Sequence, residues 1–430
     1  MKQTFKSMVV SILNAEAAIL LKRRKPMIIA VTGSVGKTST KDAIYAAIKN
    51  QVYARKSHLS YNSDIGVSLT ILGLQNAWNN PFLWLVNIVE GFFIALFSTD
   101  YPAVLILEMG IDRPGDMEKL VSWIKPDIVV LTRLPDVPVH VEYFSSPAAV
   151  AEEKMKLVGA LKADGVFIFN NDDKAIQASL ADILQRQVGF GRYLETDFTA
   201  SDDKVVYHDD QPVGIEFRLT HLGDSSKVLI KDIVGSQNVY SCTAALAVAN
   251  ELNVPLADAI ESLKTFKTPN GRMKIIRGIK SSVIIDDTYN SSPVAVEQAF
   301  EAIKELSYAK RKILVLGDML ELGKFSSDEH KRIGTLVPRV ANVLFTVGIR
   351  ARQIAEGAQV AGMSERNIYQ YDDVARVGRE LQNFIQPGDV ILVKASQGIR
   401  AEKIVEEVMN RPEKAAELLV RQDKKWQDIA

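Results

Sequence analysis

Cysteine is nearly absent from this chain of 430 residues, which contains only Cys242. A single cysteine excludes an internal disulfide and a cysteine-based zinc site, and it fits a reducing compartment such as the cytoplasm. Net charge is absent too, because 52 basic residues balance 52 acidic ones. No overall field therefore attracts nucleic acid or an anionic membrane.

An apolar run of about 20 residues, the length that spans a bilayer, is also missing. The most apolar stretch, Phe82 to Phe97 (FLWLVNIVEGFFIALF), has 16 residues and contains Asn87 and Glu90. We expect it to form a helix packed on the protein; the alternatives are an interfacial or partner-binding helix and membrane insertion. This stretch is therefore a candidate for peripheral contact with a membrane or a partner.

A second apolar segment, residues 8–21, is interrupted by Asn14 and Glu16 and has no small-residue cleavage site. These features favour an N-terminal amphipathic helix within residues 1–26 over a signal peptide. The basic run KRRK that follows is consistent with contact to lipid headgroups and equally with a solvated helix end.

A glycine-containing loop with the sequence GSVGKTS follows the apolar residues 27–31 and precedes a helical pattern. Glycines let backbone N–H groups converge on phosphate oxygens, and the helix N-terminus adds a favourable dipole. Lys37 would neutralise the terminal phosphates, and Thr38 would offer its hydroxyl to Mg²⁺. The chain is therefore predicted to use ATP, bound by Gly33, Ser34, Val35, Gly36, Lys37, Thr38 and Ser39.

Apolar strand-like runs alternate with helical stretches along most of the chain, as in parallel sheets with crossover helices. Many of these runs end in a polar residue or a glycine, at the edge where open α/β sheets bind ligands. An α/β fold with mostly parallel sheets is therefore predicted. Its clearest strands are 27–31, 104–108, 128–132, 166–170, 283–286, 312–317, 343–347 and 390–394.

Residues 193–232 have a different pattern, in which short apolar runs are separated by Asp-Asp and Gly-Asp turns. This pattern predicts an antiparallel flap on the first domain. The sequence KTPNG at 267–271 marks the best domain boundary, because a new series of strands and helices starts after it. We therefore expect a nucleotide-binding domain over residues 27–268 and a second domain over residues 269–430.

Polar residues at strand ends and in loops are further candidates for the site. Glu108 ends a predicted strand and is suited to hold Mg²⁺ or a water molecule. Asn62 lies in a loop before a helix, and His140 follows another strand, although an isolated histidine is more often a structural hydrogen-bonder. In the second domain, the segments IIDDTYNSSP, LGDMLELG and LVKASQ place acids, amides and a lysine at one sheet edge.

Six motifs occur in one order along the chain: GSVGKTS, LEMG around Glu108, HVEYF around His140, GRM at 271–273, DDTYNSSP and LGDMLELG. In this order they resemble the Mur ligase family over roughly residues 27–410. The resemblance implies a P-loop-containing central ATPase domain followed by a Rossmann-like C-terminal ligase domain. It also implies ATP-dependent amide formation, in which a substrate carboxylate is phosphorylated and an amine attacks the acyl phosphate.

The second-domain motifs resemble those of the family branch that adds D-alanyl-D-alanine to a UDP-N-acetylmuramoyl-tripeptide in peptidoglycan synthesis. The resemblance therefore implies these two substrates, with ATP and Mg²⁺ as cofactors. It also implies a cytoplasmic and monomeric enzyme that has no nucleic-acid partner.

The resemblance also implies roles for individual residues. Lys37 would contact the β- and γ-phosphates, Thr38 and Glu108 would hold one Mg²⁺, and His140 would serve a second Mg²⁺. Lys154, in the run EEKMK, resembles the family lysine that is carbamylated, which turns a cation into a carboxylate-like metal ligand. Without the resemblance, a solvated helical lysine would be the ordinary interpretation of this residue.

Further nucleotide contacts are implied by the same matches. Asn62 matches a family asparagine near the phosphates, and Arg272 would reach the nucleotide when the domains close. Asp286 and Asn290 would lie near the ribose or the phosphates. Asn238 ends the segment GSQN, which matches a family GxHN motif in which the histidine near the adenine is replaced here.

Three features depart from the family pattern. Only 26 residues precede the first predicted strand, where the family usually has a UDP-binding domain of about a hundred residues. The family KGSR motif is KASQ here, so an arginine suited to a substrate carboxylate is lost, although Arg400, one helical turn away, could substitute for it. The stretch 82–97 belongs to an insertion longer than the family usually has. Either other surfaces hold the UDP-sugar or the acceptor differs.

Two alternative functions therefore stay open. The first is a related ATP-dependent ligase of the folylpolyglutamate, cyanophycin or pseudomurein type, which the short N-terminal segment favours and the motifs DDTYNSSP and LGDMLELG oppose. The second is an ATP-binding regulatory or scaffold protein that docks a partner through residues 82–97. We also expect the helix at 82–97 to lie near the Asn62 loop, beside the N-terminal helix, as a wall of the substrate cleft or as a docking site for a membrane or partner.

Overall fold

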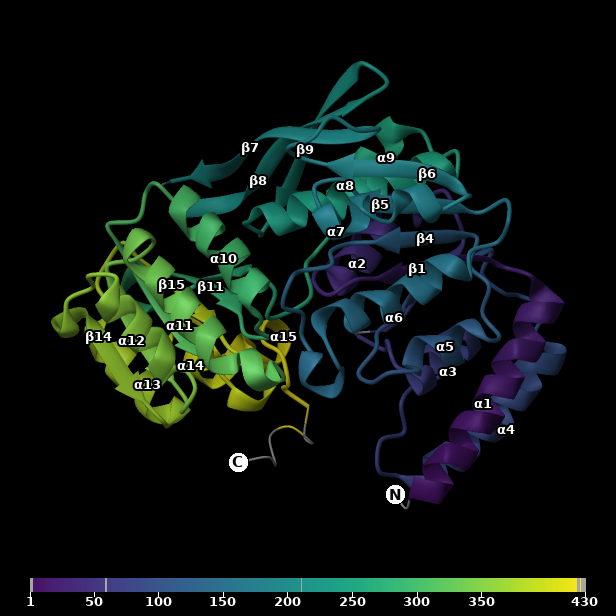
Figure 1. The fold of residues 1–430 in the computed structure, drawn as a ribbon, viewed down its shortest axis with the longest axis horizontal. Coiled ribbons are helices and arrows are strands. Elements are labelled where there is room, and N and C mark those ends of the chain that lie inside the picture. The colour runs from purple at the N-terminus through teal and green to yellow at the C-terminus, as the bar shows by residue number, and fades with distance from the viewer. Residues whose placement is uncertain (1–2, 59, 210, 424–425, 427–430) are drawn as a thin grey trace.

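The structure of the protein is a computed structural model, which describes residues 3–58, 60–209, 211–423 and 426. The chain forms two α/β halves, each built on one sheet with helices on both faces (Figure 1). The predicted fold class is confirmed. Each of the predicted strands is present, with bounds within one residue of those expected.

The first sheet consists of β1 (Met27–Thr32), β2 (Ala54–Lys56), β3 (Val104–Glu108), β4 (Ile128–Leu131), β5 (Val166–Asn170), β6 (Arg186–Gly191), β7 (Phe198–His208), β8 (Gln211–His221) and β9 (Asp224–Lys231). Their order is β2-β3-β1-β4-β5-β6-β7-β8-β9. Pairing is parallel from β2 to the start of β7 and antiparallel among β7, β8 and β9. The predicted antiparallel segment is thus an extension of this sheet, with longer strands than expected.

The helices of the first half are α1 (Gln3–Arg24), α2 (Lys37–Ile48), α3 (Asp64–Leu72), α4 (Pro81–Phe97), α5 (Asp116–Val121), α6 (Pro147–Gly159), α7 (Lys174–Gln177), α8 (Ser236–Glu251) and α9 (Leu256–Leu263). Successive side chains of a strand point to opposite faces. Ile29 and Val31 of β1 therefore pack in one core with α2 and α8, whereas Ile28 and Ala30 pack in a second core with α1, α3 and α6.

The second sheet consists of β10 (Lys274–Arg277), β11 (Val283–Asp287), β12 (Arg311–Gly317), β13 (Val343–Val347), β14 (Ile368–Tyr371) and β15 (Asp389–Lys394). Their order is β10-β11-β15-β12-β13-β14, and only β10 is antiparallel to its neighbour. This is a doubly wound, Rossmann-like arrangement. Its helices are α10 (Pro293–Glu305), α11 (Ser326–Leu336), α12 (Arg352–Val360), α13 (Val374–Phe384), α14 (Glu402–Val408) and α15 (Ala415–Leu418).

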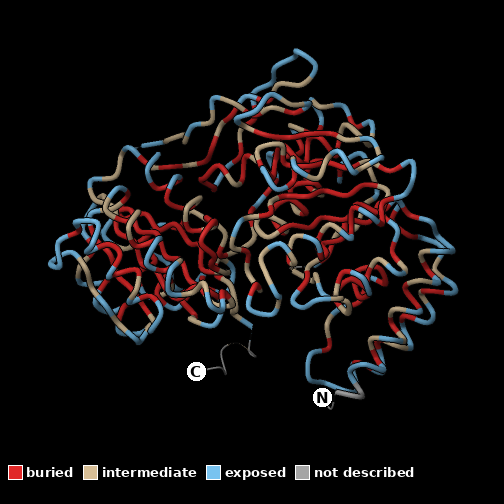
Figure 2. Tube along the Cα trace, in the orientation of Figure 1, coloured by how far each residue is buried: buried red, intermediate tan, exposed pale blue. Residues whose placement is uncertain are grey.

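Helices α1 and α4 lie side by side at the edge of the first half, away from the second half (Figure 1). The apolar helix begins where its sequence predicts, because Pro81 is its first residue and the side chain of Asn80 accepts hydrogen bonds from the N–H groups of Phe82 and Leu83. Buried and exposed residues alternate along both helices (Figure 2). Within the described ranges, no helix has the length and apolarity needed to cross a membrane.

The C-terminal segment holds two parts of the second half in place. The side-chain amide of Asn270, in the link between the halves, donates a hydrogen bond to Leu419 O at 3.0 Å. Arg421 Nη2 donates to Thr288 O at 2.9 Å and to Tyr289 O at 2.6 Å. The loop after β11 is therefore fixed by residues near the end of the chain.

Candidate active site

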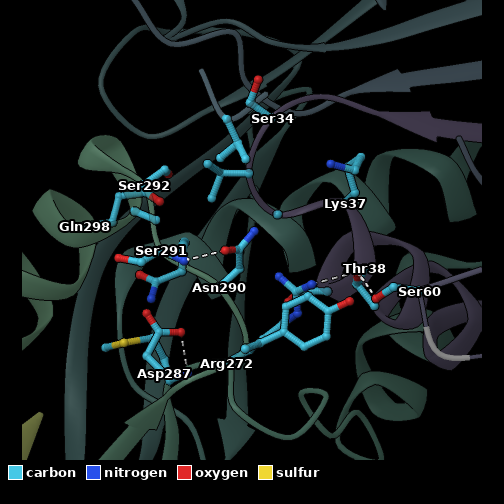
Figure 3. Close-up of a pocket in the computed structure, with 18 of the residues that line it drawn as sticks. Ser34, Lys37, Thr38, Ser60, Arg272, Asp287, Asn290, Ser291, Ser292 and Gln298 are labelled. Carbon is cyan, nitrogen blue, oxygen red and sulfur yellow. Dashed lines mark hydrogen bonds between the residues drawn. The ribbon is translucent and has the colours of Figure 1, made fainter. Parts of the chain in front are cut away.

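A cavity of about 260 Å³ lies between the two halves. Its wall in the first half comes from the loop after β1, the end of β3 and helix α6, and its wall in the second half comes from residues after β11 and from α10. Figure 3 shows Ser34, Lys37 and Thr38 of the first half across the cavity from Arg272, Asn290 and Gln298 of the second half. The strand order reverses beside β1, and open α/β sheets bind their ligands at such a point.

The loop between β1 and α2 has the backbone of a phosphate cradle. Gly36 has a φ of +86° and directly precedes Lys37, the first residue of α2. Gly33 has a φ of +136°, and a Cβ there would lie 2.1 Å from Thr132 Oγ1, so only glycine fits. Lys37 Nζ donates a hydrogen bond to Gly33 O at 2.9 Å. Burial lowers the pKa of Lys37, and the Glu108 carboxylate opposes this shift.

Glu108 ends β3, and its side chain is only 1% exposed. Its Oε1 accepts a hydrogen bond from Asn62 Nδ2 at 3.1 Å, whereas Oε2 is buried without a hydrogen-bond partner among the described residues. The hydroxyl of Thr38 lines the same cavity and lies 3.1 Å from Ser60 Oγ. A free carboxylate oxygen and a hydroxyl beside a phosphate loop are the hard donors that Mg²⁺ takes together with phosphates. These residues therefore fit a magnesium ion.

The ring of His140 lies between two acidic side chains. Its Nδ1 is 2.7 Å from Glu321 Oε2, and its Nε2 is 3.7 Å from Asp112 Oδ1. Glu321 belongs to the second half, so this contact joins the halves beside the cavity, and His140 lowers the pKa of that carboxyl. Sequence reasoning did not identify Asp112, and it placed Glu321 in the motif LGDMLELG at the sheet edge without predicting its contact with His140. In the part of the chain that the structure describes, no three His, Cys, Asp or Glu residues form a metal-binding group of their own.

Lys154, on α6, is a buried cation of the site. It lines the cavity, and its side chain is only 2% exposed. Burial and the nearby charge of Lys37 lower its pKa well below the usual value, while Asp112 and Glu153 oppose this shift. A lowered pKa makes the neutral, nucleophilic form of a lysine amine easier to reach. Lys154 is therefore not a solvated helical lysine.

Arg272 connects the second half to the phosphate loop. Its Nη2 donates a hydrogen bond to Thr38 Oγ1 at 3.1 Å (Figure 3). Its guanidinium carbon lies 4.1 Å from the centre of the Tyr289 ring. Such a cation–π contact favours one position of the long arginine side chain. Arg272 is thus held at the boundary between the two halves.

Asp286, expected near the nucleotide, does not line the cavity, whereas Asp287 does. Side chains alternate along β11, so only one of these adjacent acids can reach the cavity. Asp286 is fully buried and accepts a hydrogen bond from Thr288 Oγ1 at 2.6 Å, and burial raises its pKa to about 6. Asp287 forms a 2.6 Å ion pair with Lys394, whose Nζ also donates to Asn290 O at 2.9 Å.

Gly33 shapes the loop and accepts a hydrogen bond from Lys37, and it is not among the residues that line the cavity. Two other expectations need correction. Arg400 forms a 2.6 Å ion pair with Glu402 away from the cavity. Helix α4 lies beside α1 and α3 as expected, but none of its residues lines the cavity, so it is not a wall of this site.

The remaining predicted site residues come together around one cavity. Ser60 and Gln298 also line it, and no sequence signal identified them. The predicted residues that line it are Ser34, Val35, Gly36, Lys37, Thr38, Ser39, Asn62, Glu108, His140, Lys154, Asn238, Arg272 and Asn290.

Two family models match this chain. The Mur ligase middle domain matches residues 87–249, and the domain described as "Mur ligase, glutamate ligase domain" matches residues 271–397. These matches lie in the first and second halves of the structure, on the two sides of the cavity. The chain belongs to the Mur ligase family.

The chain is also similar to curated proteins named UDP-N-acetylmuramoyl-tripeptide--D-alanyl-D-alanine ligase. The one from Bacillus subtilis is 28% identical over 386 residues, which are 90% of this chain and 76% of that protein. The one from Escherichia coli is 27% identical over 401 residues, 91% of this chain and 78% of that protein. The MurF ligase of Thermotoga maritima, solved in complex with ADP, has a TM-score of 0.74 at 24% identity, covering 93% of this chain and 83% of that one. The chain therefore has the fold of this ligase.

Proposed function

We propose that this protein joins D-alanyl-D-alanine to a UDP-N-acetylmuramoyl-tripeptide through an amide bond, with ATP as the phosphoryl donor. The names of the curated relatives support this, because the similarity extends over about nine-tenths of the chain. The observation that carries the proposal is that Lys37, Glu108 and Lys154 of the first half meet Arg272 of the second half at one cavity.

The loop of residues 34–39 would hold the phosphates of ATP, with Lys37 as the counter-charge. Bound by Thr38 and Glu108 Oε2, Mg²⁺ would neutralise negative charge that develops on the phosphates. Asn62 hydrogen-bonds Glu108 Oε1 and so leaves Oε2 as the free donor. We assign a second Mg²⁺ to His140 and to the carbamate of Lys154, whose neutral amine would add to CO₂ with loss of a proton.

The reaction would proceed in two steps. The terminal carboxylate of the tripeptide attacks the γ-phosphorus of ATP, the bond to the β-phosphate oxygen breaks, and ADP leaves. The amine of D-alanyl-D-alanine then attacks the acyl carbon, loses a proton, and inorganic phosphate leaves. An acyl phosphate hydrolyses in water, so the two halves must enclose it until the amine attacks. The bond between Arg272 and Thr38 would hold the halves together during this interval.

A related ligase with a different acceptor is the second candidate. Gln397 lines the cavity at the position where the family motif has an arginine, and Arg400 is engaged by Glu402. A substrate carboxylate at this position would therefore meet a neutral amide instead of a guanidinium group. This difference favours an acceptor whose carboxylate does not bind at Gln397, or an acceptor that has no carboxylate at this position.

We also assign residues 27–268 to the central domain, residues 269–430 to the C-terminal domain and residues 1–26 to an N-terminal helix. A monomer is proposed because both walls of the cavity come from one chain. A cytoplasmic location is proposed because ATP is the phosphoryl donor and the only cysteine, Cys242, is buried and unpaired.

The test uses the purified full chain with ATP, Mg²⁺ and D-alanyl-D-alanine, with and without UDP-N-acetylmuramoyl-tripeptide. We expect phosphate release only when both substrates are present, together with a product whose mass equals the tripeptide plus D-alanyl-D-alanine minus water. Parallel reactions with L-glutamate as the amine and with folate or tripeptide as the carboxylate test the second candidate. Phosphate release with another pair, and none with this pair, would overturn the proposal.

A further inference from the structure

Helix α4 exposes an apolar stripe along its full length, opposite its buried residues. The stripe consists of Phe82, Val86, Val89, Phe93 and Phe97, whose exposed fractions range from 40% to 69%. At 3.6 residues per turn, positions spaced three or four apart lie on one face of a helix. Isolated exposed apolar residues are ordinary, but a contiguous patch of this kind marks an interaction surface.

Three more apolar residues widen the stripe on one side. Leu85, Phe92 and Leu96 are 57%, 49% and 38% exposed. The rings of Phe92 and Phe97 lie 5.8 Å and 6.0 Å from the ring of Phe93, so the aromatic side chains form a cluster. We refer to these eight residues as the α4 apolar face. Glu90 is the only charged residue of the helix.

The opposite side of α4 is packed tightly, so the apolar face is not the side of a detached helix. Trp84 is 2% exposed, and its Nε1 donates a hydrogen bond to Trp78 O at 2.8 Å. Asn87 is buried as well. A Cβ on Gly91 would lie 2.2 Å from Glu16 Oε2, so α1 and α4 approach closely. The apolar face is therefore presented on a fixed support.

Basic residues gather at one end of this face. Helix α1 ends in Lys22, Arg23 and Arg24, and Lys25 follows directly. Hydrogen bonds place this run beside the C-terminal end of α4. Arg23 donates hydrogen bonds to the carbonyl oxygens of Leu96 and, at 2.6 Å, of Ser98. Arg24 donates to Thr99 O at 2.6 Å. Cations are favoured at a helix C-terminus, and these bonds hold two of them next to the exposed aromatic cluster.

We propose that the α4 apolar face docks on the surface of an anionic lipid bilayer, with its apolar side chains among the acyl chains and residues 22–25 on the lipid phosphates. The four cations at 22–25 outnumber the two exposed acids in and just after α4, Glu90 and Asp100. Apolar side chains beside a basic cluster are the combination that binds a membrane interface. The contact is peripheral and independent of the proposed ligase activity.

The test is sedimentation of the full chain with vesicles of phosphatidylglycerol and phosphatidylcholine, compared with vesicles of phosphatidylcholine alone. We expect binding to the anionic vesicles, weaker binding to the neutral ones, and a decrease with added salt. F93S/F97S should weaken binding by about tenfold or more, because two apolar side chains lose their burial. K22Q/K25Q should weaken binding to the anionic vesicles by about fivefold for each charge removed.

Matched controls remove the same residue types elsewhere on the surface. Leu184 and Leu222 are 96% and 89% exposed and lie far along the chain from α4, so L184S/L222S should bind as the wild type does. K403Q/K414Q removes two exposed lysines of the second half and should also leave binding unchanged. Each variant must keep its thermal midpoint and ATPase activity, which shows that it is folded.

Two results would overturn the proposal. One is that the wild type stays in the supernatant with anionic vesicles. If it also forms a dimer that F93S/F97S abolishes, the α4 apolar face is occupied by a second copy of the chain and not by lipid. The other is that F93S/F97S binds the anionic vesicles as tightly as the wild type.

Discussion

Arg272 of the second half donates a hydrogen bond to the hydroxyl of Thr38 in the first half, at 3.1 Å. Ser60 Oγ lies 3.1 Å from the same hydroxyl oxygen. A hydroxyl has one proton and two lone pairs. Thr38 can therefore accept from Arg272, donate to Ser60 and still offer one lone pair to a metal. The contact between the halves and the proposed metal ligand thus share one atom without excluding each other.

The first prediction concerns this contact. Arg272→Ala should lower kcat by about 100-fold, because the second half loses its bond to the phosphate-loop helix. Arg272→Lys should recover only part of the loss, since a lysine lacks the planar fork that bonds Thr38 and stacks on Tyr289. Steady-state kinetics measure both variants, and Arg218→Ala, which removes an exposed ion pair with Asp202, is the matched control. A kcat for Arg272→Ala within twofold of the wild type would contradict the role.

The second prediction concerns the phosphate cradle. Lys37→Ala should lower ligase activity by about 100-fold or more, because it removes the cation that faces the phosphates. The fold should stay intact, since Lys37 stands at the first position of α2 and is not part of a hydrophobic core. Phosphate release and the thermal midpoint are the two measurements, with Lys403→Ala as an exposed control. Ligase activity within tenfold of the wild type would refute the assignment.

The third prediction concerns the carbamate on Lys154. Lys154→Ala should lose activity by about 100-fold, and short-chain carboxylic acids such as acetate should restore part of it, because they replace the lost carboxylate group. Lys156→Ala, on the same helix but exposed and paired with Glu153, should stay active. Mass spectrometry of the intact protein under CO₂ should also detect the adduct in the wild type. Full activity of Lys154→Ala without added acids would exclude the carbamate.

The fourth prediction concerns pH and the contact between α1 and α4. Burial raises the pKa of Glu16 from 4.5 to about 7, so the folded protein holds this proton more tightly than the unfolded chain. The free energy of unfolding is therefore highest, with respect to this group, below about pH 4.5. It decreases as the pH rises through about 7, because the buried carboxyl must then lose its proton. Glu16→Gln should therefore raise the thermal midpoint by several degrees near pH 8 and by less near pH 5.

Scanning calorimetry at the two pH values gives the result for Glu16. The control is Glu90→Gln, which removes an exposed carboxyl from the neighbouring helix. Equal effects of Glu16→Gln at both pH values would show that the carboxyl is not the source of the pH dependence.

Much of the fold and of the first-half site could be predicted from the sequence, because both depend on local patterns. The phosphate loop needs glycines at positions of positive φ and a lysine at a helix start, and all of these are neighbours in the chain. Glu108 was identified because it ends an apolar run, and the end of a parallel strand is where ligands bind.

Other features depend on contacts between distant parts of the chain, which no local pattern reports. The proximity of His140 and Glu321 exists only because the second half lies against the first. The choice between Asp286 and Asp287 depends on which face of β11 points to the cavity, and two adjacent acids give no sign of that. The sequence at 82–97 predicted a helix, but its exposed side is decided by the packing of Trp84 and Gly91.

The hydrogen bonds from Arg421 to the carbonyl groups of Thr288 and Tyr289 join positions 133 and 132 residues apart. Chains fold from the N-terminus during synthesis, so the phosphate loop and its sheet can form while the second half is still being made. The loop that carries Tyr289, on which Arg272 stacks, gains these hydrogen bonds only after Arg421 has left the ribosome. A nascent chain therefore has a formed phosphate cradle well before it has a complete active site.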